Sequence, residues 1–216
     1  MLPIGDDTTG RKTFPYMNYA IIVACFIVFL IELSQGNAFI QQYSVTPANL
    51  LANPVGLFYT VFTAMFMHAS WLHILGNMLF LWIFGDNVED AFGHFRYLLF
   101  YLLCGIIATF AQVFAGPTST VPNLGASGAI AGVMAAYLVL FPGQRVRVLL
   151  IFFVVNLRAW LVIGLWIAIQ VFSELVAGPS GGVAYMAHIG GFSTGLLITF
   201  LVRGKLQRLR QPSIAQ

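Results

Sequence analysis

Two side chains with the chemistry of a nucleophile and a base lie in separate apolar segments of the chain. Ser127 belongs to the small-residue segment Gly125–Gly128, and His188 belongs to the similar segment Ala187–Gly191. A serine hydroxyl is a weak nucleophile until a base accepts its proton, and a histidine ring accepts protons near neutral pH. Polar residues are costly inside a membrane and are therefore candidates for function. The two segments predict a catalytic Ser–His pair that lies where water is scarce.

A third apolar segment carries polar groups at helical spacing. His73 and Asn77 are four residues apart and share one face of a helix, and His68 precedes them. A tetrahedral intermediate needs hydrogen-bond donors for its oxyanion. The Asn77 amide, the His73 imidazole and the Ser127 backbone N–H are suitable donors. We expect no acidic residue at the same depth in these helices, so the sequence predicts a dyad without a carboxylate.

Small residues surround both members of the predicted pair. Gly128 and Gly132 repeat at a spacing of four after Ser127, and Ala187, Gly191 and Gly195 repeat in the same way around the histidine. Such small-xxx-small faces allow two helices to cross closely in a membrane. A close crossing is needed to bring the hydroxyl within about 3 Å of an imidazole nitrogen.

The composition is that of an integral membrane protein. Hydrophobic residues make up 59% of the chain, charged residues only 8%, and the mean hydropathy is +0.87, whereas soluble domains carry about 25% charged residues. We expect an all-α polytopic bundle with six membrane helices. The expected spans are Tyr19–Leu33, Phe62–Phe84, Tyr97–Phe114, Gly125–Phe141, Leu157–Val176 and Val183–Val202. Turn-forming residues such as Gly85–Asn87 separate them, and the apolar stretch Val148–Asn156 either extends the fifth span or lies along the membrane surface.

All ten Lys and Arg residues fall on one side of this six-span arrangement. They are Arg11, Lys12, Arg96, Arg145, Arg147, Arg158, Arg203, Lys205, Arg208 and Arg210. Because basic residues stay on the cytoplasmic side, we expect both termini in the cytoplasm and the dyad to open to the opposite side. The chain then divides into a cytoplasmic segment (1–17), a membrane domain (18–203) and a basic cytoplasmic tail (204–216). This placement explains the net charge of +3 by topology and argues against a nucleic-acid partner.

The connection between the first two spans, Ser34–Val61, is uncharged and rich in aromatic residues. We expect it to lie partly in the outer interface of the bilayer, where aromatic side chains are favoured. Glu32 and Glu174 are expected as interfacial residues at outer helix ends. His94 is expected to be solvated at the cytoplasmic edge.

Four stretches resemble the motifs of rhomboid intramembrane serine proteases. The segment Gly125–Gly128 resembles the family's GxSG motif, His73–Asn77 its HxxxN motif, and Ala187–Gly195 its AHxxGxxxG motif. The stretch Gly85–Gly93 resembles the region after the second helix, which in the family contains a helix-capping glutamate, here Glu89. The resemblance covers about residues 18 to 203 in the family's order, and the first three motifs together are specific.

The resemblance implies a rhomboid-like bundle, a protease function and a role for each matching residue. Ser127 would be the nucleophile, His188 the general base and His68 a residue that organises water. The expected oxyanion donors are the side chains of His73 and Asn77 and the backbone amides of Ala126 and Ser127. The family cleaves transmembrane protein substrates near their outer end, without cofactor or metal. The resemblance also implies a multi-pass protein of a bacterial inner or cell membrane.

The sequence departs from the family at two places. Many members have a tyrosine that stacks on the catalytic histidine, and this position is Ala131 here. Tyr185, one turn before His188 in its own helix, is one aromatic that could replace it, and the sequence does not assign one. The Trp-Arg pair found in the first loop of many members is absent.

Other functions stay open from the sequence. Ser127 alone fits a hydroxyl bonded to the preceding helical turn, and His188 alone fits an interhelical hydrogen bond. A rhomboid-like protein can bind transmembrane clients without cutting them, although such relatives usually lose the serine or the histidine. A transporter with a histidine proton relay is a third class, but we find no convincing repeat between the halves of the chain. For a protease, the fifth span, Leu157–Val176, and the loop Gly178–Gly182 are candidates for a substrate gate and lid.

Overall fold

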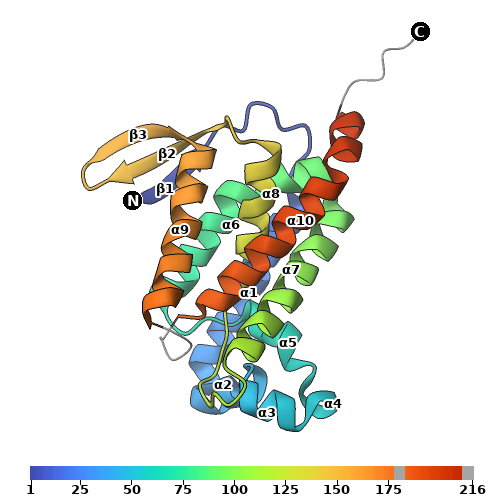
Figure 1. Ribbon diagram of the computed structural model, residues 1–216, viewed down its shortest axis with the longest axis vertical. Coiled ribbons are helices and arrows are strands. Elements are labelled where there is room, and N and C mark those ends of the chain that lie inside the picture. Colours follow the sequence, from blue (N-terminus) through green and yellow to red (C-terminus); the bar gives the residue numbers. More distant parts are fainter. Residues whose placement is uncertain (178–182, 211–216) are drawn as a thin grey trace.

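The computed structural model describes residues 1–177 and 183–210, and within them six long helices form a bundle (Figure 1). These helices are α1 (Tyr16–Gln35), α6 (Trp71–Phe92), α7 (His94–Ala115), α8 (Ser127–Leu140), α9 (Ala159–Ala177) and α10 (Tyr185–Arg210). The expectation of a helical polytopic membrane protein is confirmed. By length and hydropathy, four of the described helices qualify as membrane spans, namely α1, α7, α9 and α10. A fifth qualifies if the segment Pro54–Phe66 is joined to α6, from which it is bent by 77°.

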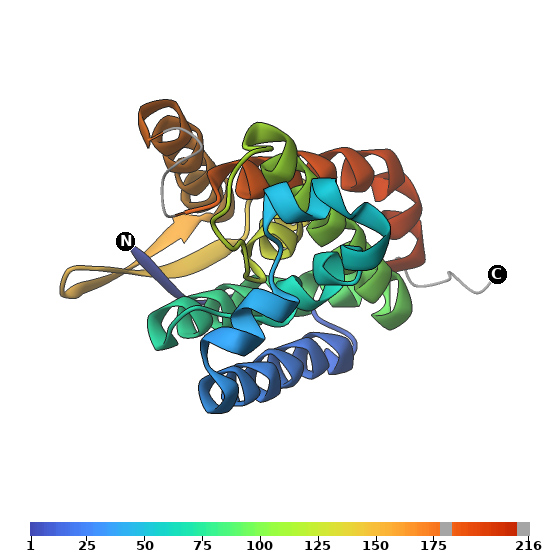
Figure 2. The same cartoon turned by 90° about the horizontal axis from the view of Figure 1, so that it is seen from below.

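Helix α8 lies at the centre of the bundle, as the view along the long axis shows (Figure 2). All its residues from Gly128 to Tyr137 are buried, and it packs against α6, α7, α9 and α10. Its 14 residues give a length of about 21 Å, less than the roughly 30 Å of a bilayer's hydrocarbon core. The C-terminal end of α8 lies toward the end of the bundle that carries the strands (Figure 1), so its N-terminal end is recessed from the opposite end.

The second helix differs from the expected span Phe62–Phe84. Ser70 caps α6, because its hydroxyl accepts a hydrogen bond from the His73 backbone N–H at 3.2 Å, so the helix begins at Trp71. Helix α6 then continues to Phe92, and Gly93, at φ +80°, ends it.

The turn predicted at Gly85–Asn87 is wrong, since these residues lie inside α6. Gly85 is needed there for a close approach of side chains. A Cβ atom at this position would lie 2.7 Å from both Asn18 Cγ and the Tyr97 hydroxyl oxygen. The glycine therefore serves packing between helices and does not mark a break.

The uncharged connection between the first two long helices folds into short helices. They are α2 (Asn37–Tyr43), α3 (Pro47–Ala52), α4 (Pro54–Leu57), α5 (Thr60–Thr63) and the 3-10 helix η1 (Ala64–Phe66). They gather at the end of the bundle opposite the strands (Figure 1). Val55, Phe58 and Leu51 are exposed there, which fits a position in the membrane interface.

The stretch 148–156 does not extend the fifth helix. It belongs to a hairpin of β2 (Arg145–Leu150) and β3 (Phe153–Arg158), and β1 (Leu2–Asp6) adds to the other edge of β2 in an antiparallel, three-stranded sheet. In β2, the buried residues Val146 and Val148 alternate with the exposed residues Arg145 and Arg147. This alternation is typical of a strand with one covered face. The expectation of an all-α fold therefore missed a small sheet.

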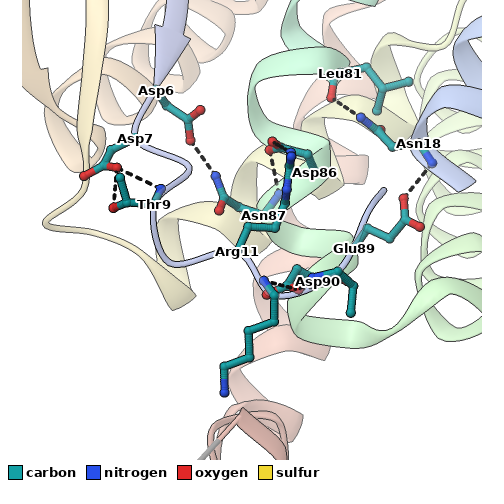
Figure 3. A network of polar contacts seen from close by, with 12 residues as sticks. Asp6, Asp7, Thr9, Arg11, Asn18, Leu81, Asp86, Asn87, Glu89 and Asp90 are labelled. Carbon is teal, nitrogen blue, oxygen red and sulfur yellow. Dashed lines mark hydrogen bonds and ion pairs between the residues drawn. The ribbon is translucent and has the colours of Figure 1, made fainter. Parts of the chain in front are cut away.

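Polar contacts attach the N-terminal segment to the end of α6 that lies beside the sheet (Figure 3). Asp6 accepts hydrogen bonds at 2.6 Å from Asn87 Nδ2 and from the Tyr137 hydroxyl. Arg11 forms an ion pair with Asp86 at 2.6 Å. The described basic residues belong to or adjoin elements at this end, namely the three strands, the start of α7 and the end of α10.

Glu89 fixes the beginning of α1. Its two carboxylate oxygens accept hydrogen bonds from the backbone N–H groups of Met17 and Asn18, at 2.9 and 2.6 Å. Pro15, which precedes the helix, gives no side-chain cap, so a residue of α6 supplies it. The capping role that the resemblance implies for Glu89 is found here. His94, expected to be solvated, pairs with the same carboxylate through its Nδ1 atom.

Candidate active site

Ser127 is the first residue of α8, after a turn that requires a glycine. Gly125 has φ +137°, a conformation that other residues rarely adopt, and its N–H donates to the Ala64 carbonyl oxygen at 2.9 Å. A Cβ atom at Gly125 would lie 2.9 Å from His73 Nε2 and 3.7 Å from Ser127 Oγ. The turn therefore places the hydroxyl and the His73 ring on either side of one small space. The Ser127 N–H belongs to the first turn of α8, whose N–H groups have no partner within the helix.

The structure brings the hydroxyl of Ser127 and the ring of His188 together. Ser127 Oγ lies 2.8 Å from His188 Nε2. The approach of α8 and α10 is close enough that a Cβ atom at Gly191 would overlap the Gly128 backbone, and one at Gly195 would lie 2.6 Å from Gly132 Cα. Glycine at these positions thus permits the hydrogen bond between the two helices.

The other side of the His188 ring contacts α9. Gln170 Oε1 lies 2.7 Å from His188 Nδ1. The Trp166 ring, one turn earlier on α9, is tilted against the histidine ring, with centroids 5.6 Å apart and planes at 41°, whereas Tyr185 meets it edge-on at 6.4 Å. Trp166 therefore supplies the aromatic contact that the tyrosine position, Ala131, lacks.

Sequence reasoning missed both residues of α9. Gln170 carried a usable signal, because it is a polar residue inside an apolar span. Trp166 and Gln170 are also four residues apart and share a helix face. An aromatic residue alone in an apolar helix gives no such signal.

Helix α6 carries the two predicted side-chain donors, His73 and Asn77, and His68 lies in the segment before it. Asn77 is 9% exposed, and its Nδ2 has no hydrogen-bond partner within residues 1–177 and 183–210. It lies one turn after His73, whose Nδ1 accepts a hydrogen bond from the Ala69 N–H at 3.3 Å. The His68 and His73 rings meet edge-on with centroids 5.1 Å apart.

Glu32, expected as an interfacial residue at the outer end of its helix, contacts the segment before α6. It is buried, and its Oε2 accepts a hydrogen bond from the His68 backbone N–H at 3.0 Å. The carboxylate holds the segment that leads from η1 into α6. It therefore joins the end of α1 to the turn before His73.

A cavity of about 40 Å³ adjoins Ser127 between α7, α8 and the turn before α8. Gln112, Thr109 and Asn123 contribute polar atoms to its lining. Gln112 Oε1 also accepts a hydrogen bond from the Ala187 N–H at 3.2 Å. The volume and the polar lining are enough for a water molecule. The cavity therefore has room for water next to Ser127.

In the part of the chain that the structure describes, no group of three His, Cys, Asp or Glu side chains is arranged to hold a metal ion. Cys25 and Cys104 are buried free thiols. The predicted lid, 178–182, lies outside the described residues. The groups around Ser127 are a hydroxyl, an imidazole ring, backbone N–H groups and a small cavity, a combination that suits acyl transfer.

Comparison with known proteins gives a consistent family. The sequence model of the Rhomboid domain matches residues 55–205. The putative rhomboid protease YdcA of Bacillus subtilis is 27% identical over 93% of this chain and 94% of its own length. The rhomboid protease GluP of the same organism is 30% identical over 85% of this chain, and rhomboid protein 1, mitochondrial, of Saccharomyces cerevisiae is 27% identical over 94% of it. The chain spans 34% of the former and 57% of the latter.

Proposed function

Since the chain belongs to the rhomboid family, we propose that it is an intramembrane serine endopeptidase that cuts other proteins in or near their transmembrane segments. The observation that carries the proposal is the 2.8 Å contact between Ser127 Oγ and His188 Nε2. The relatives named as proteases support the same class of reaction. Both groups are present here, whereas relatives that only bind their clients usually lose one of them.

In the first step, His188 Nε2 accepts the Ser127 proton while Oγ attacks the carbonyl carbon of the scissile bond. The oxyanion that forms accepts hydrogen bonds from the Ser127 N–H and from Asn77 Nδ2. Asn77 suits this role because its buried amide donor is unpaired among the described residues. His73, whose Nε2 faces the turn at Gly125, is the third donor.

Collapse of the intermediate releases the amine, which takes the proton from His188 Nε2–H and leaves an acyl group on Ser127. A water molecule then attacks this ester, and His188 again accepts a proton. The cavity beside Ser127 is a suitable source of this water. Hydrolysis returns the serine hydroxyl and the neutral histidine to their starting state.

Helix α9 is our proposed gate for the substrate. Only 22% of its span is buried, the smallest share among the four candidate spans of the described chain. Leu165, Ile169 and Phe172 are exposed along it. A cross-link between α6 and α9 is expected to block cleavage of a membrane substrate, and full activity after cross-linking excludes this gate.

The orientation that we propose places both termini in the cytoplasm and the Ser127 end of α8 toward the outer face. The basic residues support it because they lie at the strand end of the bundle. Alkaline phosphatase fused after position 210 should be inactive, since this enzyme is active outside the cytoplasm. An active fusion contradicts the orientation and leaves the chemistry of the site unaffected.

Cleavage of a generic transmembrane substrate by the purified protein in detergent tests the activity. The wild type and Ser193→Ala should cut, because Ser193 is an exposed serine on α10 and serves as a matched control. Ser127→Ala and His188→Ala should not cut. Equal cleavage by all four proteins refutes the dyad. No cleavage by the wild type, together with retention of the substrate, favours a protein that binds transmembrane clients.

A fluorophosphonate probe gives a second measurement that needs no substrate. It should label the wild type at Ser127 and leave Ser127→Ala unlabelled. Undiminished labelling of Ser127→Ala would show that the reactive serine is elsewhere.

A further inference from the structure

Both nitrogen atoms of the His188 ring have partners on other helices. Nε2 faces Ser127 Oγ on α8, and Nδ1 faces Gln170 Oε1 on α9 at 2.7 Å. Both His188 and Gln170 are buried, at 8% and 9% exposure. The second contact is therefore shielded from water, where a hydrogen bond has more effect on the state of the ring.

The orientation of the Gln170 amide follows from its other contact. Gln170 Nε2 donates to the Trp166 carbonyl oxygen at 3.5 Å, one turn earlier on α9. Reversing the amide would bring two acceptor oxygens together and lose this bond. The carbonyl oxygen therefore faces His188, and an amide oxygen only accepts hydrogen bonds.

An acceptor at Nδ1 decides which ring nitrogen carries the proton. With Gln170 Oε1 at this side, the neutral ring holds its hydrogen on Nδ1 and leaves the lone pair on Nε2. Only this tautomer can take the proton of Ser127 Oγ. The opposite tautomer would present an N–H to the hydroxyl and could not act as a base.

We propose that Gln170 is a positioning residue, a neutral third member of the catalytic group that holds His188 in its working tautomer and orientation. The proposal deepens the function proposed above and rests on it. A carboxylate in this place would also accept from Nδ1, but burying its charge without a cation is costly. An amide gives the same hydrogen bond without a buried ion. It also accepts from the ring after the ring has taken the serine proton.

The decisive variants change the acceptor and keep the length of the side chain. Gln170→Met removes the acceptor, and Gln170→Glu retains it. We expect Gln170→Met to lower kcat roughly 10–100-fold with KM within about twofold, because substrate binding is not altered. Gln170→Glu should recover most of the lost kcat at alkaline pH, where the buried carboxylate is ionised and accepts from Nδ1. The proposal is overturned if Gln170→Met has the kcat of the wild type. It is also overturned if Gln170→Glu at alkaline pH loses as much rate as Gln170→Met.

The tautomer itself is measured by ¹⁵N NMR of histidine-labelled protein, with the His188 signal identified by its loss in His188→Gln. The wild type should show a proton on Nδ1 and a bare Nε2, and Gln170→Met should show a mixture of tautomers. A wild-type ring protonated on Nε2 overturns the proposal whether or not the protein cuts. Cleavage by Ser127→Ala would instead refute the function of the dyad, and the spectrum would still report the contact with Gln170.

Discussion

Gly191→Ala tests the close crossing of α8 and α10 that the dyad requires. Gly191 lies three residues after His188 and faces the backbone of Gly128. A Cβ atom at position 191 would lie 2.8 Å from the Gly128 carbonyl carbon and closer still to its oxygen. These are backbone atoms of a buried helix, so they cannot swing aside as a flexible side chain can. The added methyl group must therefore push the two helices apart.

The size of the effect follows from the distances. Ordinary van der Waals contact begins at 3.4 Å, so we estimate that the helices must separate by about 1 Å, a misplacement that can reduce an enzyme's rate about 100-fold. The Ser127–His188 distance, now 2.8 Å, would then exceed the range of about 3.5 Å in which a hydrogen bond forms. The expected loss is about 100-fold in kcat and in the rate of fluorophosphonate labelling.

Gly204→Ala is the matched control, since Gly204 lies on the same helix and a Cβ atom there would meet nothing within 4 Å. This variant should keep the wild-type rates, and replacing a helical glycine by alanine should not lower its stability. Thermal unfolding measured beside labelling shows whether Gly191→Ala still folds. If Gly191→Ala keeps both the wild-type labelling rate and the wild-type melting temperature, the argument from the close crossing is wrong.

Three further predictions concern other parts of the molecule. Asn77→Ala should lower kcat roughly 10–1000-fold, as loss of an oxyanion donor does, and an unchanged rate in the cleavage assay would mean that backbone amides suffice. Glu89→Ala should lower the free energy of unfolding by about 2–4 kcal/mol, because two backbone N–H groups of α1 lose their buried acceptor; equal denaturation midpoints for this variant and the wild type would contradict it. Burial raises the pKa of the Asp6 carboxyl from 3.8 to about 6. The folded protein therefore binds a proton at Asp6 more tightly than the unfolded chain does. The stability that this proton contributes is present below pH 4 and is lost as the pH rises through 6. Asp6→Asn should therefore flatten the melting temperature measured from pH 4 to 7, and parallel curves for the two proteins would exclude this role.

The reactive pair could be predicted from sequence because its signals are local. Ser127 and His188 each lie in a short run of small residues, and the same glycines that mark the motifs permit the helix crossing. The contact between them followed once the two segments were assumed to run side by side at one depth. Their catalytic roles stay predictions that the cleavage assay decides.

Gln170 and Trp166 could not be placed by the same reasoning. Their function depends on how α9 is rotated and how far it is shifted along α10, and an apolar helix has few polar residues to fix either. The family tyrosine lies on α8, whereas Trp166 reaches the histidine from α9. Ala131 thus showed that the tyrosine contact is missing, but it did not show which helix supplies an aromatic residue instead.

The boundaries that failed did so where tertiary contacts outweigh local signals. Gly85 looked like a turn residue, but it lies in α6 so that Asn18 and Tyr97 can approach. The stretch 148–156 is apolar enough to resemble a membrane segment. Its pairing with β1, from the far end of the sequence, makes it part of a sheet, and such a long-range partner is not visible in the stretch itself.

The distribution of charge explains why the proposed catalytic group is neutral. Buried carboxylates of the described chain lie toward the ends of helices, where backbone N–H groups or an arginine compensate them: Glu89 at the start of α1, Asp86 beside Arg11, and Glu32 at the turn before α6. The Nδ1 side of His188 faces the middle of α9, where the backbone groups are used within the helix, so this side offers no such compensation. A carboxylate next to His188 would therefore have only the transient imidazolium as its partner. The Gln170 amide keeps the ring proton on Nδ1 at a lower cost of desolvation than a carboxylate would. Gln170 thus takes the position that an aspartate has in soluble serine proteases.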